Sequence, residues 1–184
     1  MSLAASIKIP MGTLMPSFCL SDPRGKDYRS EDVIGGRGLL VLFTSNSCPY
    51  THAAWPRLVR LAKHAQCLGI NTVAISARTS AKDPKDTPKE MLRIIKEFKI
   101  SFPYLIDDGQ KVAKHFEAQC TPDIFLYDHD QKLVYHGRID DNWRDESKAT
   151  SFNLKLAVDA LAAGEPVERR QISSMGRSIK WRTP

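Results

Sequence analysis

The chain has 184 residues, of which 42% are hydrophobic and 26% charged, and its formal net charge is +6. This composition is ordinary for a soluble globular protein, and the length suffices for one domain with a sizeable core. Lys8, Pro10 and Pro16 interrupt the early apolar residues, so we expect neither an export signal nor a membrane span. The basic end of the chain lacks interleaved aromatic residues, which favours a solvated tail over nucleic-acid binding.

The hydrophobic pattern predicts helices that alternate with strands in the first half of the chain. In chain order, we expect a strand at 18–22, a short helical start at 28–32, a strand at 39–43, a helix at 50–66 closed by Gly69, a strand at 71–76, a loop at 78–88, a helix at 88–98, a strand at 102–107, a helix at 110–117, a hairpin of 124–127 with 132–136, and a helix at 151–162 ended by Gly164. This alternation predicts a parallel core, to which the hairpin adds antiparallel strands.

The expected fold class is therefore α/β, with a central mixed β-sheet flanked by helices on both faces. We place this domain at residues 16–165, after an N-terminal lead-in at 1–15 and before a basic C-terminal extension at 166–184. The ligand-facing edge of such a sheet lies at the carboxyl ends of its parallel strands.

Four cysteines occur in the chain, at Cys19, Cys48, Cys67 and Cys120. They are too few and too dispersed for a small secreted fold held by disulfides, so we expect a cytoplasmic protein with free thiols. Cys19 in a strand and Cys67 late in a helix are expected to be core residues.

Cys48 lies in a polar turn between an apolar strand and an amphipathic helix. Unpaired amide groups at the start of a helix favour negative charge, so a thiolate is stabilised there and thiol redox chemistry is indicated. Pro49 suits the first helical position, where its missing N–H costs nothing. Tyr50 and Thr51 are expected to line the site. The Thr51 hydroxyl would hydrogen-bond either the thiolate or a local group at the helix start.

Four segments together resemble the thioredoxin-like superfamily. They are Asn46-Ser47-Cys48-Pro49-Tyr50, Cys120-Thr121-Pro122-Asp123, Gly137-Arg138-Ile139-Asp140-Asp141 and Ser178-Ile179-Lys180-Trp181. Within that superfamily, the chain is most similar to the peroxiredoxin-like redoxins related to alkyl hydroperoxide reductase and thiol-specific antioxidant, over roughly residues 10–181. The resemblance implies a thioredoxin-like fold.

The resemblance also implies that the Thr121–Pro122 peptide bond is cis and faces Cys48, although Pro122 is alternatively an ordinary proline at the entry to a strand. Thr121 would then offer its backbone to a substrate chain by strand addition. Cys120 should lie near Cys48, either as a resolving cysteine or as a small buried apolar residue. Arg138 would place charge beside the substrate groove or belong to a structural ion pair with the neighbouring aspartates.

The sequence departs from the family pattern at several positions. Thr51 stands where thioredoxin has its second cysteine, and Arg177 stands where a cysteine often follows the tail glycine. The peroxidatic cysteine, threonine and arginine of true peroxiredoxins are not in register, and Arg57 and Arg60 are expected to face solvent. These departures lead us to favour disulfide exchange over peroxide reduction.

The resemblance implies a thiol-dependent oxidoreductase in which the Cys48 thiolate attacks a protein or small-molecule disulfide, or a peroxide, with an external thiol as reductant. The alternative is a non-catalytic thioredoxin-fold module that binds an extended peptide. The sequence holds no glycine-rich phosphate loop and no zinc-ligand spacing, so we expect no cofactor and no metal. Redoxin relatives often form homodimers, but the sequence carries no interface signature.

Overall fold

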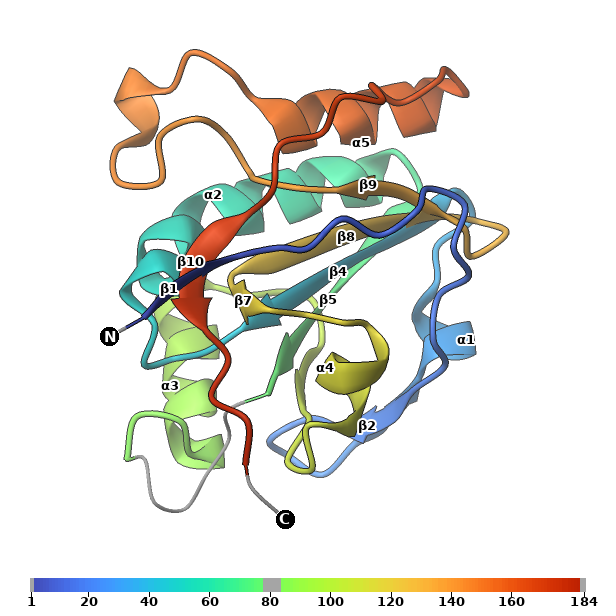
Figure 1. The fold of residues 1–184 in the computed structure, drawn as a ribbon. Helices are drawn as coiled ribbons and strands as arrows, with labels where there is room; N and C mark the ends of the chain where they lie inside the picture. Colours follow the sequence, from blue (N-terminus) through green and yellow to red (C-terminus); the bar gives the residue numbers. More distant parts are fainter. Residues whose placement is uncertain (1, 78–83, 183–184) are drawn as a thin grey trace.

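A computed structural model of the chain describes residues 2–77 and 84–182. Within these residues, a central sheet has the strand order β3-β2-β6-β5-β4-β8-β9 (Figure 1). Its strands are β2 (Cys19–Ser21), β3 (Asp27–Arg29), β4 (Gly38–Thr44), β5 (Ile70–Ser76), β6 (Tyr104–Ile106), β8 (Asp123–Asp128) and β9 (Leu133–His136). Strand β4 pairs in parallel with β5 and antiparallel with β8. The predicted parallel core with an added hairpin is therefore confirmed.

Helices cover both faces of this sheet. They are α1 (Ser30–Val33), α2 (Pro49–Cys67), α3 (Pro88–Phe98), α4 (Lys111–His115) and α5 (Asn153–Ala163), with a 3-10 turn, η1, at Glu146–Lys148. Successive side chains of a strand point to opposite faces. Leu40 and Leu42 of β4 therefore pack with α2, α3 and α5, whereas Val41 and Phe43 pack with α1 and α4.

The longer helices begin and end where their sequence signals lie. Helix α3 starts at Pro88, and the Thr87 side chain caps it by accepting a hydrogen bond from the backbone N–H of Glu90 at 3.3 Å. Gly164 adopts a left-handed backbone conformation and ends α5. Most of the predicted loop at 78–88 lies outside the described residues.

A second, three-stranded sheet was not predicted. It has the order β1-β10-β7, formed by β1 (Leu3–Ala5), β10 (Met175–Ser178) and β7 (Cys120–Thr121). The expected lead-in and C-terminal extension thus lie side by side and pair with each other, close to the start of α2 (Figure 1). Strands this short carry no readable alternation of apolar and polar residues, and their partners are distant in the sequence.

Several other expectations were wrong. Cys19 and Cys67 are exposed instead of buried, because each lies on the outward side of its element. Residues 27–29 form a strand, and the helix predicted from residue 28 begins only at Ser30. Among the described residues, no helix is long and apolar enough to cross a membrane.

Candidate active site

Cys48 is the N-cap residue of α2, and Pro49 occupies the first turn. The Cys48 backbone is extended, with φ −90° and ψ 117°, because the chain is leaving the turn that follows β4. Its side chain is completely buried. The thiol donates a hydrogen bond of 3.0 Å to the backbone carbonyl of Thr121. The structure therefore brings together the helix start and the Thr121–Pro122 segment, as the sequence motifs indicate.

Asp86 holds the turn that leads into Cys48. Its buried carboxylate accepts hydrogen bonds from the backbone N–H of Asn46 at 2.7 Å and from the Ser47 hydroxyl at 2.6 Å. The Ser45 hydroxyl donates to the same carboxylate at 3.1 Å. Sequence reasoning missed Asp86, because it lies in a polar loop and nothing in that loop marks it as a partner of the turn.

The Thr121–Pro122 peptide bond is cis, and Thr121 is completely buried. The strand-addition hypothesis requires that the backbone edge of Thr121 be open to a substrate chain. It is not open, because Thr121 lies directly opposite Arg177 of β10. Gly176 permits this close approach, since a Cβ atom there would overlap the Thr121 carbonyl oxygen. The tail of the chain therefore occupies the edge that we expected a substrate to use.

Arg177 reaches from β10 to the turn before Cys48. Its Nη1 donates to the Ser47 carbonyl oxygen at 3.0 Å and lies 3.4 Å from the Ser47 hydroxyl. Within the described residues, its buried Nε–H has no hydrogen-bond acceptor. Arg177 was noted in the sequence only as a departure from the family pattern, and its side chain is a part of the site that sequence reasoning missed.

Cys120 is buried beside the site but points elsewhere. Its thiol contacts the carbonyl oxygens of Pro122 at 3.5 Å and Ser174 at 4.0 Å. Burial raises the pKa of the Cys120 thiol, and the nearby charges of Asp123 and Cys48 raise it further. Both Cys48 and Cys120 are free thiols. Because a resolving cysteine must attack as a thiolate, this environment does not favour that role for Cys120.

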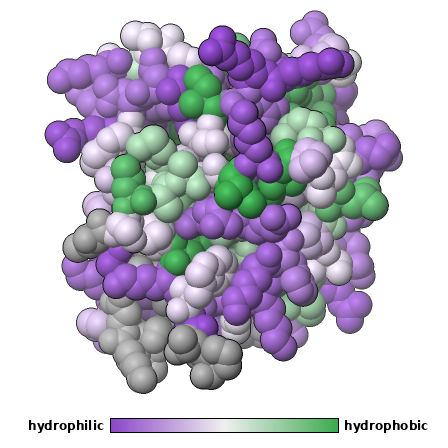
Figure 2. All heavy atoms as spheres, in the orientation of Figure 1, coloured by the Kyte–Doolittle hydropathy of each residue, from purple (hydrophilic) through white to green (hydrophobic). Residues whose placement is uncertain are grey.

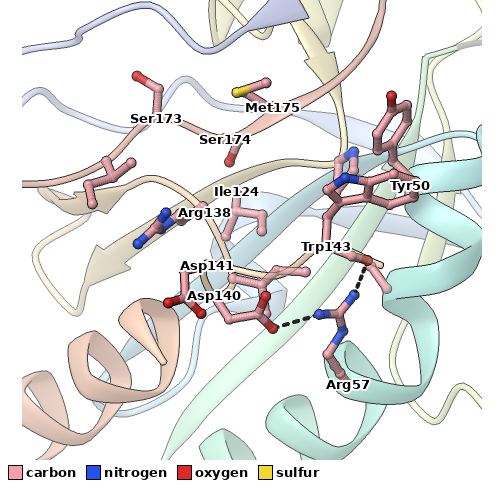
Figure 3. A pocket seen from close by; sticks show the side chains of 14 residues that line it. Tyr50, Arg57, Ile124, Arg138, Asp140, Asp141, Trp143, Ser173, Ser174 and Met175 are labelled. Atoms are coloured by element: carbon pink, nitrogen blue, oxygen red, sulfur yellow. Dashed lines mark hydrogen bonds and ion pairs between the residues drawn. The ribbon is translucent and has the colours of Figure 1, made fainter. Parts of the chain in front are cut away.

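Tyr50 and Thr51 follow Cys48 on α2 and differ in exposure. Thr51 is completely buried, and its hydroxyl has no hydrogen-bond partner among the described residues, so neither expected bond is present. The Tyr50 ring lies 4.3 Å from the Trp143 ring, between centroids, and both line a cavity of about 150 Å³ beside Pro122 (Figure 3). Arg138 also lines this cavity, and its Nε donates to Asn153 at 2.9 Å.

The floor of this cavity contains a buried ion pair that sequence reasoning assigned differently. Arg57, expected to face solvent, is buried and contacts the Asp140 carboxylate at 2.7 Å (Figure 3). Arg57 also donates to the backbone carbonyls of Asn142 and Trp143. Its position on the inward side of α2 places it under the segment that follows β9. Asp140 is therefore a structural ion-pair residue, but with Arg57 and not with Arg138.

No group of three or more metal-ligating side chains occurs within residues 2–77 and 84–182. The polar groups gathered around Cys48 are instead hydroxyls, amides, one carboxylate and one guanidinium. The reactive group of this arrangement is therefore the sulfur itself.

Comparisons with known proteins agree with this arrangement. A family model described as AhpC/TSA family matches residues 11–136. The crystal structure of an uncharacterized conserved protein from Geobacillus kaustophilus is 36% identical, with a TM-score of 0.93, and the match covers 100% of this chain and 98% of that chain. A hypothetical protein from Sinorhizobium meliloti is 35% identical, with a TM-score of 0.92, covering 98% of this chain and 99% of that chain.

More distant proteins share the fold. Thiol-disulfide oxidoreductase ResA from Bacillus cereus is 25% identical over 127 residues, which is 69% of each protein. The thioredoxin domain of a thiol-disulfide oxidoreductase from Bacteroides vulgatus is 20% identical, with a TM-score of 0.59, and the match covers 70% of this chain and 89% of that chain. The fold is thioredoxin-like, and the chain belongs to the AhpC/TSA family.

Proposed function

We propose that the chain is a thiol–disulfide oxidoreductase with Cys48 as its nucleophile. The observation that carries this proposal is the position of Cys48 at the start of α2, with its sulfur 3.0 Å from the Thr121 carbonyl next to the cis Pro122. The AhpC/TSA family match and the relatives named as thiol-disulfide oxidoreductases support it. Helix starts favour the thiolate, which is the attacking form of a thiol.

The reaction proceeds by three successive thiolate attacks, the first by Cys48 and the other two by external thiols. The Cys48 thiolate attacks one sulfur of a substrate disulfide, so a mixed disulfide forms and the other substrate sulfur leaves as a thiolate. The thiolate of an external thiol then attacks the mixed disulfide. If it attacks the substrate sulfur, Cys48 leaves as a thiolate, and the external thiol remains joined to the substrate until a second external thiol releases it. Two electrons pass from the external thiols to the substrate disulfide.

An external thiol is needed because the chain lacks a well-placed second cysteine. Position 51, one helical turn after Cys48, is a threonine. Cys120 is buried, and its thiol pKa is raised. We therefore infer a mechanism with a single nucleophilic cysteine, in which the reductant is a separate molecule.

Disulfide exchange is favoured over peroxide reduction for an electrostatic reason. Reduction of a peroxide requires donors aimed at both oxygens of the breaking bond. Among the described residues, the Cys48 sulfur donates to a carbonyl acceptor, and the Arg177 guanidinium donates to the Ser47 backbone and hydroxyl. Exchange needs only a thiolate, an accessible disulfide and a leaving thiol.

The test compares disulfide and peroxide consumption by the purified protein in the presence of excess glutathione. A peptide carrying one intermolecular disulfide serves as the first substrate and hydrogen peroxide as the second. We expect saturable disulfide reduction that Cys48→Ser abolishes and that the matched control Cys67→Ser, at an exposed thiol, leaves unchanged. Faster, Cys48-dependent loss of peroxide would reverse the order of the two reactions. Peptide binding without either reaction would identify a non-catalytic binding module.

A further inference from the structure

Strand β10 lies where a substrate chain would add beside Cys48. Arg177 is opposite Thr121, and Ser178 is opposite Cys120, in antiparallel register. An extended polypeptide recognised through the Thr121 backbone would need the same hydrogen-bonding edge. Because each edge of a strand accepts only one partner, β10 and such a substrate cannot bind this edge at the same time.

The same segment contacts residues that surround the nucleophile. Cys48 and Thr121 are both completely buried, and the Cys48 thiol hydrogen is satisfied by the Thr121 carbonyl. Arg177 extends from β10 to the Ser47 carbonyl oxygen, one residue before Cys48. The tail thus contacts the site at two places, the Thr121 strand and the turn that precedes α2.

We propose that β10 is an internal occupant of the substrate edge, held by Arg177, and that a polypeptide disulfide must displace it to reach Cys48. This inference rests on the proposed function and deepens it, because it assigns the substrate to the class of extended polypeptides. In the closed chain, the Cys48 sulfur is buried and hydrogen-bonded to the Thr121 carbonyl. Opening exposes both the sulfur and the Thr121 edge in one step.

The contacts that hold β10 are few enough for such an opening. Its ladder with β7 contains two residue pairs, and its other neighbour, β1, is a three-residue strand. The Nε–H of Arg177 is buried without an acceptor among the described residues, and an unsatisfied buried donor is unfavourable. Met175 of β10 is exposed, whereas Ile179 directly after the strand is buried in the core and would anchor the tail, so the proposed opening is local to the strand.

The surface around β10 suits a polypeptide partner. Leu3 of β1 and Met175 of β10 are large hydrophobic residues that are 53% and 56% exposed. On this face, hydrophobic side chains lie among hydrophilic ones (Figure 2). The cavity lined by Tyr50, Pro122 and Trp143 lies next to Met175 (Figure 3). If β10 were displaced, this cavity and the Thr121 edge would form one continuous path for a substrate chain.

The first experiment prevents the opening with a disulfide. Ser178→Cys places a thiol directly opposite Cys120. The Ser178 amide donates to Ser2 of the other neighbouring segment, so positions 178 and 120 form a non-hydrogen-bonded pair. In antiparallel strands such pairs have the shorter Cα–Cα distance, which a disulfide can bridge. After oxidation with diamide, peptide mapping by mass spectrometry identifies protein that carries the 120–178 link. We expect Cys48 in this linked protein to react with iodoacetamide at least about tenfold more slowly than after reduction, and peptide disulfide exchange to fall equally. Ser178→Cys combined with Cys120→Ser is the control that cannot form this link.

The second experiment loosens the contact. Arg177→Met removes the guanidinium but keeps most of the apolar stem, and we expect Cys48 alkylation at pH 7 to rise about tenfold, which corresponds to about 1.4 kcal/mol. Arg177→Lys should give a smaller rise, because one donor to the Ser47 carbonyl is retained. Lys180→Met, at an exposed tail cation, is the matched control and should leave the rate unchanged.

The outcomes separate this inference from the proposed function. If the linked protein reacts as fast as the reduced protein, or if Arg177→Met leaves alkylation unchanged, β10 does not restrict access and the inference is wrong. Slower alkylation in Arg177→Met would also overturn it, because Arg177 would then be activating the thiolate. If Cys48 becomes accessible in Arg177→Met but no variant exchanges disulfides, the closure by β10 stands and the proposed function fails.

Discussion

The thiol of Cys48 donates a hydrogen bond of 3.0 Å to the carbonyl of Thr121, a residue 73 positions further along the chain. This contact joins the start of α2 to the strand that precedes the cis Pro122. Within the buried site, this hydrogen bond holds the Cys48 sulfur against the Thr121 backbone. The contact therefore describes a resting state of the nucleophile, and reaction requires that this hydrogen bond break.

Thr51→Cys should convert the chain to a mechanism with two cysteines. The Thr51 side chain is completely buried, and its hydroxyl has no partner within the described residues, so replacement by cysteine removes no hydrogen bond. Cysteine behaves as a small apolar residue when buried. We expect a disulfide between positions 48 and 51 after mild oxidation, measured as the loss of two free thiols relative to the reduced variant. Thr51→Ser is the control and should lose none, and an equal loss of thiols on oxidation in both variants would contradict the prediction.

Asp86→Asn should loosen the turn before Cys48. The carboxylate accepts hydrogen bonds from the Asn46 amide and the Ser47 hydroxyl, and an asparagine side chain accepts fewer and weaker ones. We expect the free energy of unfolding to fall by about 1–3 kcal/mol and the Asn46 amide to exchange its hydrogen faster. Urea titration and hydrogen exchange measure the two effects. Asp130→Asn, in an exposed turn, should change stability by less than about 0.5 kcal/mol.

Cys120 should make stability fall in alkaline solution. Burial raises the pKa of its thiol in the folded chain, whereas an unfolded cysteine ionises with a pKa of about 8.5. Above that pH, only the unfolded state loses the proton, so the unfolded state is favoured progressively. Between pH 8 and 9.5, we expect wild type to lose about 1 kcal/mol more stability than Cys120→Ala. Parallel urea titrations of the two proteins isolate this contribution, and identical pH slopes would show that Cys120 ionises normally.

The buried ion pair under the cavity should contribute more to the free energy of unfolding than an exposed ion pair on the same helix. Arg57→Met leaves the Asp140 carboxylate buried without its partner, so we expect a loss of about 3–5 kcal/mol in unfolding free energy. Arg60→Met removes an exposed pair with Glu146 and should cost less than about 1 kcal/mol. Thermal and urea unfolding of the two variants provide the comparison.

A second substitution tests the cause of that loss. Asp140→Leu in the Arg57→Met background removes the unpaired carboxylate, so it should restore part of the stability. Recovery will be incomplete because Arg57 also donates to the carbonyls of Asn142 and Trp143. If the double variant is no more stable than Arg57→Met, the unpaired charge is not the main source of the loss.

The sequence alone was sufficient for the strands of the central sheet other than β3, for the longer helices and for the position of the nucleophile. The apolar run in β4, the helical periodicity of α2 and the Pro88 start of α3 are local patterns, and local patterns are readable because they repeat along one element. Cys48 could be placed at the start of a helix for the same reason. The Thr121–Pro122 segment was found only through its resemblance to a family motif.

The tertiary structure decided everything that depends on contacts between distant segments. The pairing of β1 with β10, the carboxylate of Asp86 under the turn and the burial of Arg57 join residues that no local pattern connects. The closure of the Thr121 edge by Gly176 and Arg177 belongs to the same class. Such contacts arise when separate elements are packed together, because side-chain position then depends on the whole fold and not on the neighbouring residues in the sequence.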